Sequence, residues 1–312
     1  MSPRGPDTVR AGLVSAAERP LAQFIADLPR TAGDRSYEAI HDARVALRRL
    51  GALLRAFAPV LPAATVAGIK REIRWLRREM GPARDLDVFI HQTGPELVAV
   101  FGAKRGLKAL LEVARKRRAP LAARLAKTIA SRRCALFLKT LSRVFGPDGG
   151  PSRPRRRRRR AARAPRLDQP FAPFAFAELR RRYKKLRKSA DRVDKLSEGD
   201  LHRMRIRLRN FRYVCDGFRM LLPEGRYLAM RSAMTKLQDH MGALNDAVTA
   251  PLLVADLARK PNPGHDAAAL ARASGVVAGW GAARRQVLRA ALDDPWQRLV
   301  KRGDRLFSVL KD

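Results

Sequence analysis

Aromatic residues are scarce in this sequence of 312 residues, since they make up 6% of the chain although 46% of it is hydrophobic. Ala, Leu and Val carry most of the apolar content. This mixture excludes wholesale disorder and favours helices. At this length the chain can form two domains of ordinary size, each with its own core.

Cysteine is also scarce, because only Cys134 and Cys215 are present and they lie far apart. Two isolated thiols exclude a disulfide framework and a cysteine-based metal cluster, so we expect a reducing, cytoplasmic environment. The apolar stretch 11–17 is interrupted by Glu18 and Arg19 and has no signal-peptide cleavage pattern. No run approaches the roughly 18 apolar residues of a membrane span. We expect a soluble protein without a membrane partner.

Acidic residues are few compared with basic ones, since 29 Asp and Glu stand against 66 Lys and Arg and the net charge is +37. A folded protein tolerates such self-repulsion when a ligand of opposite charge offsets it. We therefore expect a polyanion as partner. The alternative is that the charge mainly keeps the protein in solution, and the positions of the cations separate the two interpretations.

The segment 146–170 reads GPDGGPSRPRRRRRRAARAPRLDQP. Proline and glycine break regular structure and the arginine run repels itself, so the segment is predicted to be a flexible linker. It divides the chain into an N-terminal helical bundle at 1–145 and a C-terminal helical bundle at 171–312.

Both halves show a hydrophobic period of about 3.6 residues and lack the alternating β-branched runs of strands. The sequence therefore predicts an all-α fold. In the first half we predict helices at 8–28, 35–58, 63–80, 84–92, 104–118 and 120–144. In the second half we predict helices at 172–193, 198–221, 225–241, 244–258, 266–292 and 296–310, the last with Asp294 as its N-cap before Pro295.

The two halves are copies of one helical hairpin. They align without a gap at a constant offset of 161 residues, from His41 and His202 through Asp85 and Asp246. Matched pairs include Arg44 with Arg205, Arg48 with Arg209, Phe57 with Phe218, and Gly81 with Gly242. Such a duplication predicts two bundles related by a pseudo-twofold axis, which would bring the matched surfaces together.

Each copy carries a cationic stripe along one helix. In the first half the stripe residues fall within roughly 60° of one another, away from the apolar face, and the second half is sorted in the same way. The stripes are His41, Arg44, Arg48 and Arg55, and His202, Arg205, Arg209 and Arg212. The predicted core faces are Leu47, Leu50, Leu53, Leu54 and Phe57, and Leu208, Phe211, Cys215 and Phe218.

The next helix of each copy differs in charge. The first half adds Lys70, Arg74 and Arg77, whereas the matched positions hold Arg231, Thr235 and Gln238. Asp216 also replaces Arg55. We therefore expect the second half to bind an anion less strongly.

A row of arginines suits phosphate oxygens, because each guanidinium donates paired hydrogen bonds and keeps its charge at any physiological pH. A chain of phosphates bridges several such groups, so affinity should rise with ligand length and fall steeply with salt. The alternative is an ordinary solvated helix face.

The histidines and aspartates leave alternatives open. His41 and His202 either donate to phosphate or serve as hydrogen-bonded structural residues. A metal-ligand role is disfavoured, because each helix supplies one histidine without Cys or carboxylate at ligand spacing. We interpret Asp85 and Asp246 first as N-terminal helix charges and otherwise as partners of a nearby arginine.

The segments HDARVALRRLGALLRAF, WLRREMGPARDLDVF, LHRMRIRLRNFRYVCDGF and LQDHMGALNDAV resemble the CHAD family, the conserved histidine α-helical domain. The likeness covers most of both halves. It implies two helical bundles with a basic groove or channel between them that binds inorganic polyphosphate. By position it implies this role for His41, Arg44, Arg48, Lys70, Arg74, Arg77 and Arg84, and for His202, Arg205, Arg209, Arg212 and Arg231.

Two features qualify what the resemblance implies. Asn245 stands where the first copy has Arg84. The Glu-x-Glu-x-Lys motif of the triphosphatase domain fused to some family members does not occur in this sequence. The resemblance therefore implies a stand-alone binding module, associated with polyphosphate granules.

Two other functions remain open at this point. The stripes would also bind the backbone of DNA or RNA nonspecifically, although no aromatic residues interleave them for base stacking. An enzyme acting on phosphoanhydrides would need clustered carboxylates or a phosphate loop, and the sequence has neither. We predict a non-catalytic binder of inorganic polyphosphate without cofactor or metal, with nonspecific nucleic-acid binding as the alternative.

Overall fold

The computed structural model describes residues 5–31, 36–147, 167–189, 193–259, 264 and 266–310. Every regular element within these ranges is helical, and the one β-bridge found there pairs Thr8 with Pro170. The predicted all-α class is confirmed. Most of the predicted linker, residues 148–166, lies outside the described residues.

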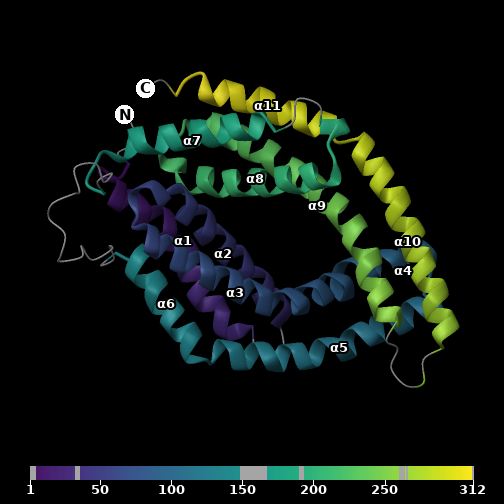
Figure 1. Ribbon diagram of the computed structural model, residues 1–312. Coiled ribbons are helices and arrows are strands. Elements are labelled where there is room, and N and C mark those ends of the chain that lie inside the picture. The colour runs from purple at the N-terminus through teal and green to yellow at the C-terminus, as the bar shows by residue number, and fades with distance from the viewer. Residues whose placement is uncertain are drawn as a thin grey trace.

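The helices follow the division of the chain into two halves (Figure 1). The first half forms α1 (Val9–Arg30), α2 (Ser36–Ala56), α3 (Ala63–Val88), α4 (Gly94–Phe101), α5 (Arg105–Ile129) and α6 (Arg132–Phe145). The second half forms α7 (Phe171–Arg187), α8 (Glu198–Gly217), α9 (Glu224–Arg259), α10 (Ala267–Ala290) and α11 (Asp293–Phe307). A π-helical turn at Phe89–Thr93 joins α3 to α4.

Two long helices run through positions where the sequence predicted breaks. The helix α3 joins the predicted helices 63–80 and 84–92, and α9 joins 225–241 and 244–258. Asp85 and Asp246 therefore lie inside helices, and their interpretation as N-terminal helix charges is wrong.

Proline does not end these helices, because packing outweighs the hydrogen bond that its ring removes. Pro82 is exposed on α3 while Met80 beside it is fully buried. The helix α5 likewise runs through Pro120, and the chain instead breaks at Ser131, whose side chain caps α6. The predicted N-cap Asp294 lies in the first turn of α11, where a carboxylate also stabilises the helix.

Both halves contribute to each of two hydrophobic clusters. The larger cluster contains every residue of the two predicted core faces, none more than 1% exposed, so these faces are confirmed. The smaller cluster joins Leu86, Leu97 and Leu110 to Val254 and Leu270. Burial of apolar side chains therefore fastens the two halves to each other as well as internally.

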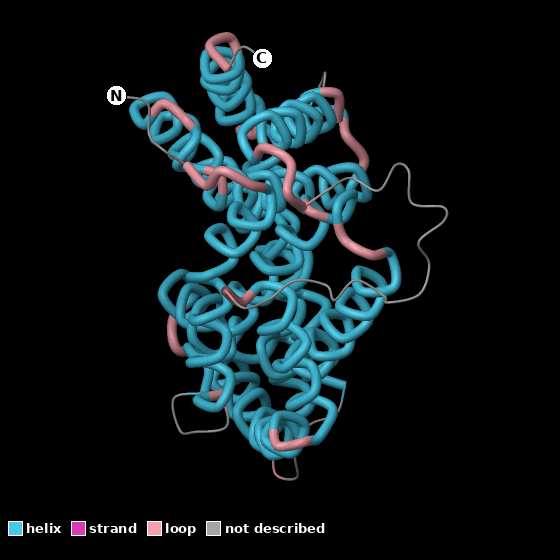
Figure 2. The backbone as a smooth tube through the Cα atoms, turned by 90° about the vertical axis from the view of Figure 1, so that its left-hand side faces the viewer, coloured by secondary structure: helices cyan, strands magenta, loops and turns pink. Residues whose placement is uncertain are grey.

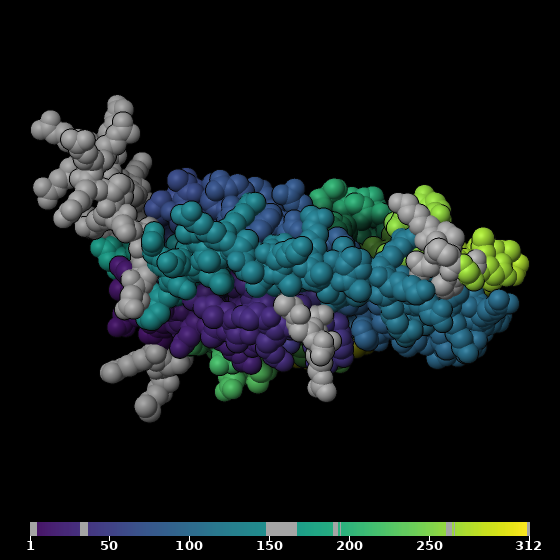
Figure 3. All heavy atoms as spheres, turned by 90° about the horizontal axis from the view of Figure 1, so that it is seen from below, coloured from purple at the N-terminus to yellow at the C-terminus, as the bar shows by residue number. Residues whose placement is uncertain are grey.

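The helix α9 links the two ends of the molecule. It leaves the group formed by α7, α8 and α11 and crosses to α4 and α5, with α10 along its side (Figure 1). The backbone seen from the side is an elongated stack of helices (Figure 2). On the face drawn in Figure 3, α5 and α6 extend across the first half. No helix in the described part of the chain is long and apolar enough to cross a membrane.

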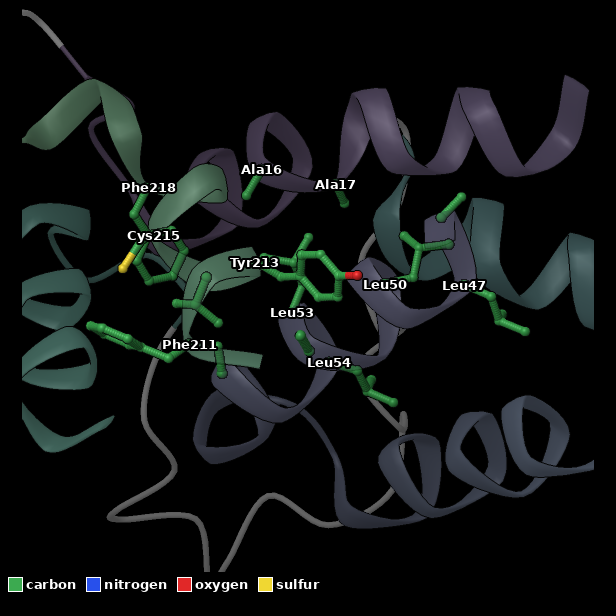
Figure 4. Packing of buried hydrophobic residues seen from close by; sticks show 14 of the residues in the cluster. Ala16, Ala17, Leu47, Leu50, Leu53, Leu54, Phe211, Tyr213, Cys215 and Phe218 are labelled. Carbon is green, nitrogen blue, oxygen red and sulfur yellow. The ribbon is translucent and has the colours of Figure 1, made fainter. Parts of the chain in front are cut away.

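The helices that carry the two stripes, α2 and α8, pack against each other. Tyr213 of α8 lies beside Leu50 and Leu53 of α2 (Figure 4) and is 3% exposed. Arg55 on α2 donates a hydrogen bond to Asn210 Oδ1 on α8 at 2.7 Å. These contacts bring the cationic residues of both halves close to one another.

Candidate functional site

A cavity of about 1000 Å³ opens between α2, α3, α8 and α9, and residues of α4 and α10 also line it. Its arginine and histidine lining comprises His41, Arg44, Arg48, Arg77, Arg84, His202, Arg205, Arg209 and Arg284. Its carboxylates are Asp85, Glu96, Asp239 and Asp246. Seven arginines against four carboxylates leave the cavity with an excess of positive charge.

A second cavity extends this basic surface along α3. It measures about 450 Å³ and shares Arg44 and Arg77 with the first cavity. Arg71, Arg74 and Arg78 complete its lining, and all three are exposed. The two cavities together form one basic surface, which we call the central site.

Four predicted site residues line neither of these cavities: Arg55, Lys70, Arg212 and Arg231. Arg55 instead ties α2 to Asn210 of α8. Arg231 pairs with Asp216 at 3.3 Å, and the guanidinium of Arg212 lies 5.4 Å from the ring centre of Tyr213. Helix periodicity shows on which side of its own helix a residue lies. Whether that side faces the cavity depends on how the neighbouring helices pack against it.

The central-site arginines of α2 and α8 are half-buried: Arg44, Arg48, Arg205 and Arg209. Burial, and then the charge of neighbouring Arg48, lower the pKa of Arg44 and of Arg209 to about 10. Both side chains stay cationic at neutral pH, so the lowered pKa reflects the cost of holding like charges together. The buried Nε atoms of Arg44 and Arg209 have no hydrogen-bond partner among the described residues. The site therefore has an excess both of positive charge and of hydrogen-bond donors.

The two aspartates serve as partners of nearby arginines, which was the second interpretation from the sequence. Burial raises the pKa of the Asp85 carboxyl, whereas Arg44 and Arg84 oppose that rise. Burial lowers the pKa of Arg205, and Asp246 partly restores it. Each copy of the hairpin therefore keeps one carboxylate beside its arginines, which offsets part of the repulsion.

The two histidines line the cavity with exposed side chains. Neither imidazole makes a hydrogen bond within the described ranges. Burial lowers the pKa of His41, and Arg84 and Arg48 lower it further. At neutral pH the His41 ring is therefore uncharged and has one N–H to donate.

Sequence reasoning missed Tyr213, which stands where the first half has Ala52. Its hydroxyl lies 3.5 Å from Arg48 Nε. Burial alone would raise the pKa of the phenol, but Arg48 and Arg209 outweigh this and lower it. Tyr213 thus contacts Arg48 of the first half through its hydroxyl and lies beside Arg212 of its own helix through its ring. Because Tyr213 lies on the apolar face of its helix, the sequence did not predict that it contacts these arginines.

Sequence reasoning also missed Arg284, because α10 lies outside the duplicated region. The Arg284 guanidinium pairs with Glu96 of α4 at 2.5 Å and lies 5.2 Å from the ring centre of Trp280. This ion pair joins the two halves at one end of the cavity. Within the described residues, no group of three or more His, Cys, Asp or Glu side chains could hold a metal ion.

Fold and site together define an all-helical protein with an arginine-rich cavity lined by both of its halves. The sequence model of the CHAD domain family matches residues 15–255, and the chain belongs to this family. It is similar to the crystal structure of the CHAD domain from the plant Ricinus communis, with a TM-score of 0.76, 25% identity, and 94% of this chain and 92% of that chain covered.

A second solved structure shares the fold. PptA from Streptomyces chartreusis matches with a TM-score of 0.63 and 18% identity, covering 94% of this chain and 100% of that chain. A comparison with curated protein sequences found no match.

Proposed function

We propose that this protein binds inorganic polyphosphate in the central site without cleaving it. The observation that carries the proposal is the group of half-buried arginines from α2 and α8, whose pKa values are lowered to about 10 where they are most enclosed. Their repulsion costs stability until an anion enters. Polyphosphate supplies negative charge at every unit and has many acceptor oxygens, so it satisfies several guanidinium groups at once.

The extent of the basic surface favours a chain over a single phosphate. The cavities of about 1000 and 450 Å³ share Arg44 and Arg77, so positive charge continues from Arg284 to Arg74. A ligand that follows this surface contacts both halves of the protein. In this proposal the two hairpins are arranged about a pseudo-twofold axis with a basic groove between them, and the matched pairs Arg44 with Arg205 and Arg48 with Arg209 both contact the ligand.

We further propose that binding is not followed by turnover. The carboxylates of the central site stand beside arginines, and Asp85 and Asp246 act as their partners rather than as a clustered base. Incubation of long-chain polyphosphate with the protein and Mg²⁺ should release no phosphate above a protein-free control. Release that persists across independently purified samples and depends on Arg48 and Arg209 would contradict this part of the proposal.

Nucleic acid is the competing ligand, since phosphate contacts alone do not identify what the phosphates belong to. Trp280 is the partly exposed aromatic side chain of the cavity lining, and Arg284 already lies over its ring. A base would have to displace that guanidinium in order to stack. Polyphosphate should therefore outcompete single-stranded DNA and RNA at equal phosphate concentration.

The direct test is calorimetric titration of long-chain polyphosphate. The background variant has the nine arginines between positions 153 and 166 replaced by Gln, which removes the contribution of the predicted linker. In that background, Arg44→Gln, Arg48→Gln, Arg205→Gln and Arg209→Gln together should abolish tight binding. The matched control replaces the exposed Arg19, Arg132, Arg143 and Arg219 by Gln and removes the same charge.

The two possible failures have different meanings. Equal losses in both variants would show that net charge alone attracts the ligand. Binding that disappears with the linker arginines would assign the activity to that segment. If the proposal holds, the protein should also collect at polyphosphate granules in the cytoplasm, and the quadruple variant should not.

A further inference from the structure

A second basic surface lies between α9 and α11, away from the central site. Two adjoining cavities of about 470 and 480 Å³ share Ala229, Arg302 and Arg305. The basic residues of their combined lining are Arg226, Lys236, Arg298, Lys301, Arg302 and Arg305. No carboxylate lines either cavity, in contrast to the central site. We call this surface the outer groove.

The outer groove and the central site use opposite faces of α9. Ala229 and Lys236 are seven residues apart and share the face toward α11, whereas Gln238 and Asn245 share the face toward the central site. Lys236 and Gln238 differ by about 200° around the helix. Figure 1 shows α11 along the outer edge of the second half. A short ligand therefore cannot touch both surfaces at once.

Four cations of the outer groove have neither an ion pair nor a side-chain hydrogen bond within the described part of the chain: Lys236, Lys301, Arg302 and Arg305. The other two are engaged, since Arg298 pairs with Asp294 at 2.8 Å and Arg226 donates to the carbonyl of Arg305 at 2.7 Å. These four cations lie on two packed helices, so their backbone positions are fixed before a ligand arrives, while their side chains are exposed to it. Such preorganisation lowers the entropic cost of binding.

The matching surface of the first half is neutralised, which shows that the outer groove is not a general result of an arginine-rich sequence. On α3, Glu72 accepts a hydrogen bond from Arg133 at 2.7 Å and Glu79 accepts one from Arg124 at 3.2 Å. At the offset of 161 residues, Glu72 corresponds to Ala233 and Glu79 to His240. The His240 ring is bound to the Leu288 carbonyl at 2.6 Å. The second half therefore has no carboxylate at either of the two matched positions.

We infer that the outer groove is a second polyphosphate-binding site, and that one protein molecule bridges two polyphosphate segments through the opposite faces of α9. The inference rests on polyphosphate being the ligand of the central site. The chemistry of the groove suits a ligand recognised by phosphate alone, because no aromatic side chain lines it for base stacking. A protein molecule that binds two segments in this way would cross-link polyphosphate chains.

The test replaces the unpaired cations of α11 in the background with the neutralised linker. Lys301→Gln, Arg302→Gln and Arg305→Gln form the groove variant, and Arg19→Gln, Lys139→Gln and Arg143→Gln form a control that removes the same charge. All six side chains are exposed, so both variants should keep the parent's thermal stability. Titration with tripolyphosphate, which is too short to reach around α9, measures how many molecules bind.

The groove variant should bind one tripolyphosphate fewer than the control and retain the tighter event of the central site. With long-chain polyphosphate, the control should form light-scattering assemblies near charge balance, and the groove variant should scatter at least tenfold less. Equal stoichiometry and equal scattering in both variants would overturn the inference.

Two further experiments distinguish failure of the proposed function from failure of the groove assignment. The quadruple central-site variant should lose the tighter event and keep the weaker one. Survival of the tighter event in this variant would refute the proposed function, while the weaker event would still be measured by comparing the groove variant with its control. Single-stranded DNA should fail to displace tripolyphosphate from the groove at equal phosphate concentration. Preferential displacement by DNA would overturn the assignment of the groove to polyphosphate.

Discussion

The first hairpin, α2–α3, and the second, α8–α9, share a sequence pattern but use their cations differently. Arg77 and Arg84 of α3 line the central site. On the other face of α3, Glu72 and Glu79 form ion pairs with Arg133 and Arg124. The helix α9 has Gln238 and Asn245 in the central site and carries Lys236 on its outer face. The two hairpins thus bury matched apolar residues but place their cations on different surfaces.

This difference predicts that the two halves contribute unequally to the central site. Arg44 adjoins Arg77 and continues into the second cavity, whereas Arg205 stands beside Asp246 and bonds to Asn245 at 3.4 Å. The first half should therefore dominate affinity, as its sequence suggested. The predictions below test this inequality.

The largest effect is expected from removing one arginine pair at a time. Arg44→Gln with Arg48→Gln should weaken polyphosphate binding by about 100-fold or more, since each charged hydrogen bond contributes roughly 1.5–3 kcal/mol. Arg205→Gln with Arg209→Gln should weaken it by about tenfold, because Asp246 already offsets part of that charge. Calorimetry in the background with the neutralised linker measures both, and equal losses would mean that the halves are equivalent.

The next effect concerns stability. Arg44 and Arg209 have a lower pKa folded than unfolded, so their charges oppose folding at neutral pH, and that cost disappears only as pH rises above about 10. Polyphosphate at 100 times its Kd should add about 2.7 kcal/mol and raise Tm by roughly 4 °C. The quadruple variant should show a higher Tm without ligand and almost no shift with it. A ligand-induced shift that survives in the variant would contradict this account.

A smaller gain is expected from restoring the missing cations. Gln238→Arg and Asn245→Arg copy the residues that α3 carries at the matched positions. Together they should raise affinity for polyphosphate by about tenfold and steepen its dependence on salt, because each added contact releases counterions. The matched control places Arg at the exposed Leu136 and Ser142 of α6, which line neither the central site nor the outer groove and should leave binding unchanged. No gain from the first pair would show that α9 does not contact the ligand.

The smallest effect concerns pH. The pKa of His41 is lowered in the folded protein, so protonation is disfavoured there and the unliganded protein loses stability as pH falls below about 6.5. Bound polyphosphate favours the imidazolium. Affinity should therefore rise a few-fold between pH 8 and pH 5.5, and His41→Gln should remove most of that rise. An unchanged pH profile in the variant would exclude His41 from the contact surface.

Much of the fold followed from the sequence because hydrophobic spacing reports which helix face is buried. Leu47 and Phe211, chosen from that spacing, are at most 1% exposed. The breaks predicted at Gly81 and Gly242 do not occur, since α3 and α9 are held by tertiary contacts that no local pattern records. Pro82 likewise lies inside α3 although proline disfavours a helix interior, because tertiary packing outweighs that preference.

The central site was only partly predictable, for a geometric reason. The stripe on α2 correctly grouped Arg44 and Arg48, but Arg55 on the same stripe lies at the contact with α8. Periodicity cannot show where a neighbouring helix crosses. Arg284 and Tyr213 were missed because one lies outside the repeat and the other occupies an apolar face.

The most direct measurement is a crystal structure of the protein with polyphosphate of defined length. The account predicts continuous phosphate density along the central site, with oxygens within hydrogen-bond distance of both Arg48 and Arg209. Density confined to one half, or phosphate held only by the segment between positions 153 and 166, would contradict the claim that the two hairpins form one binding surface.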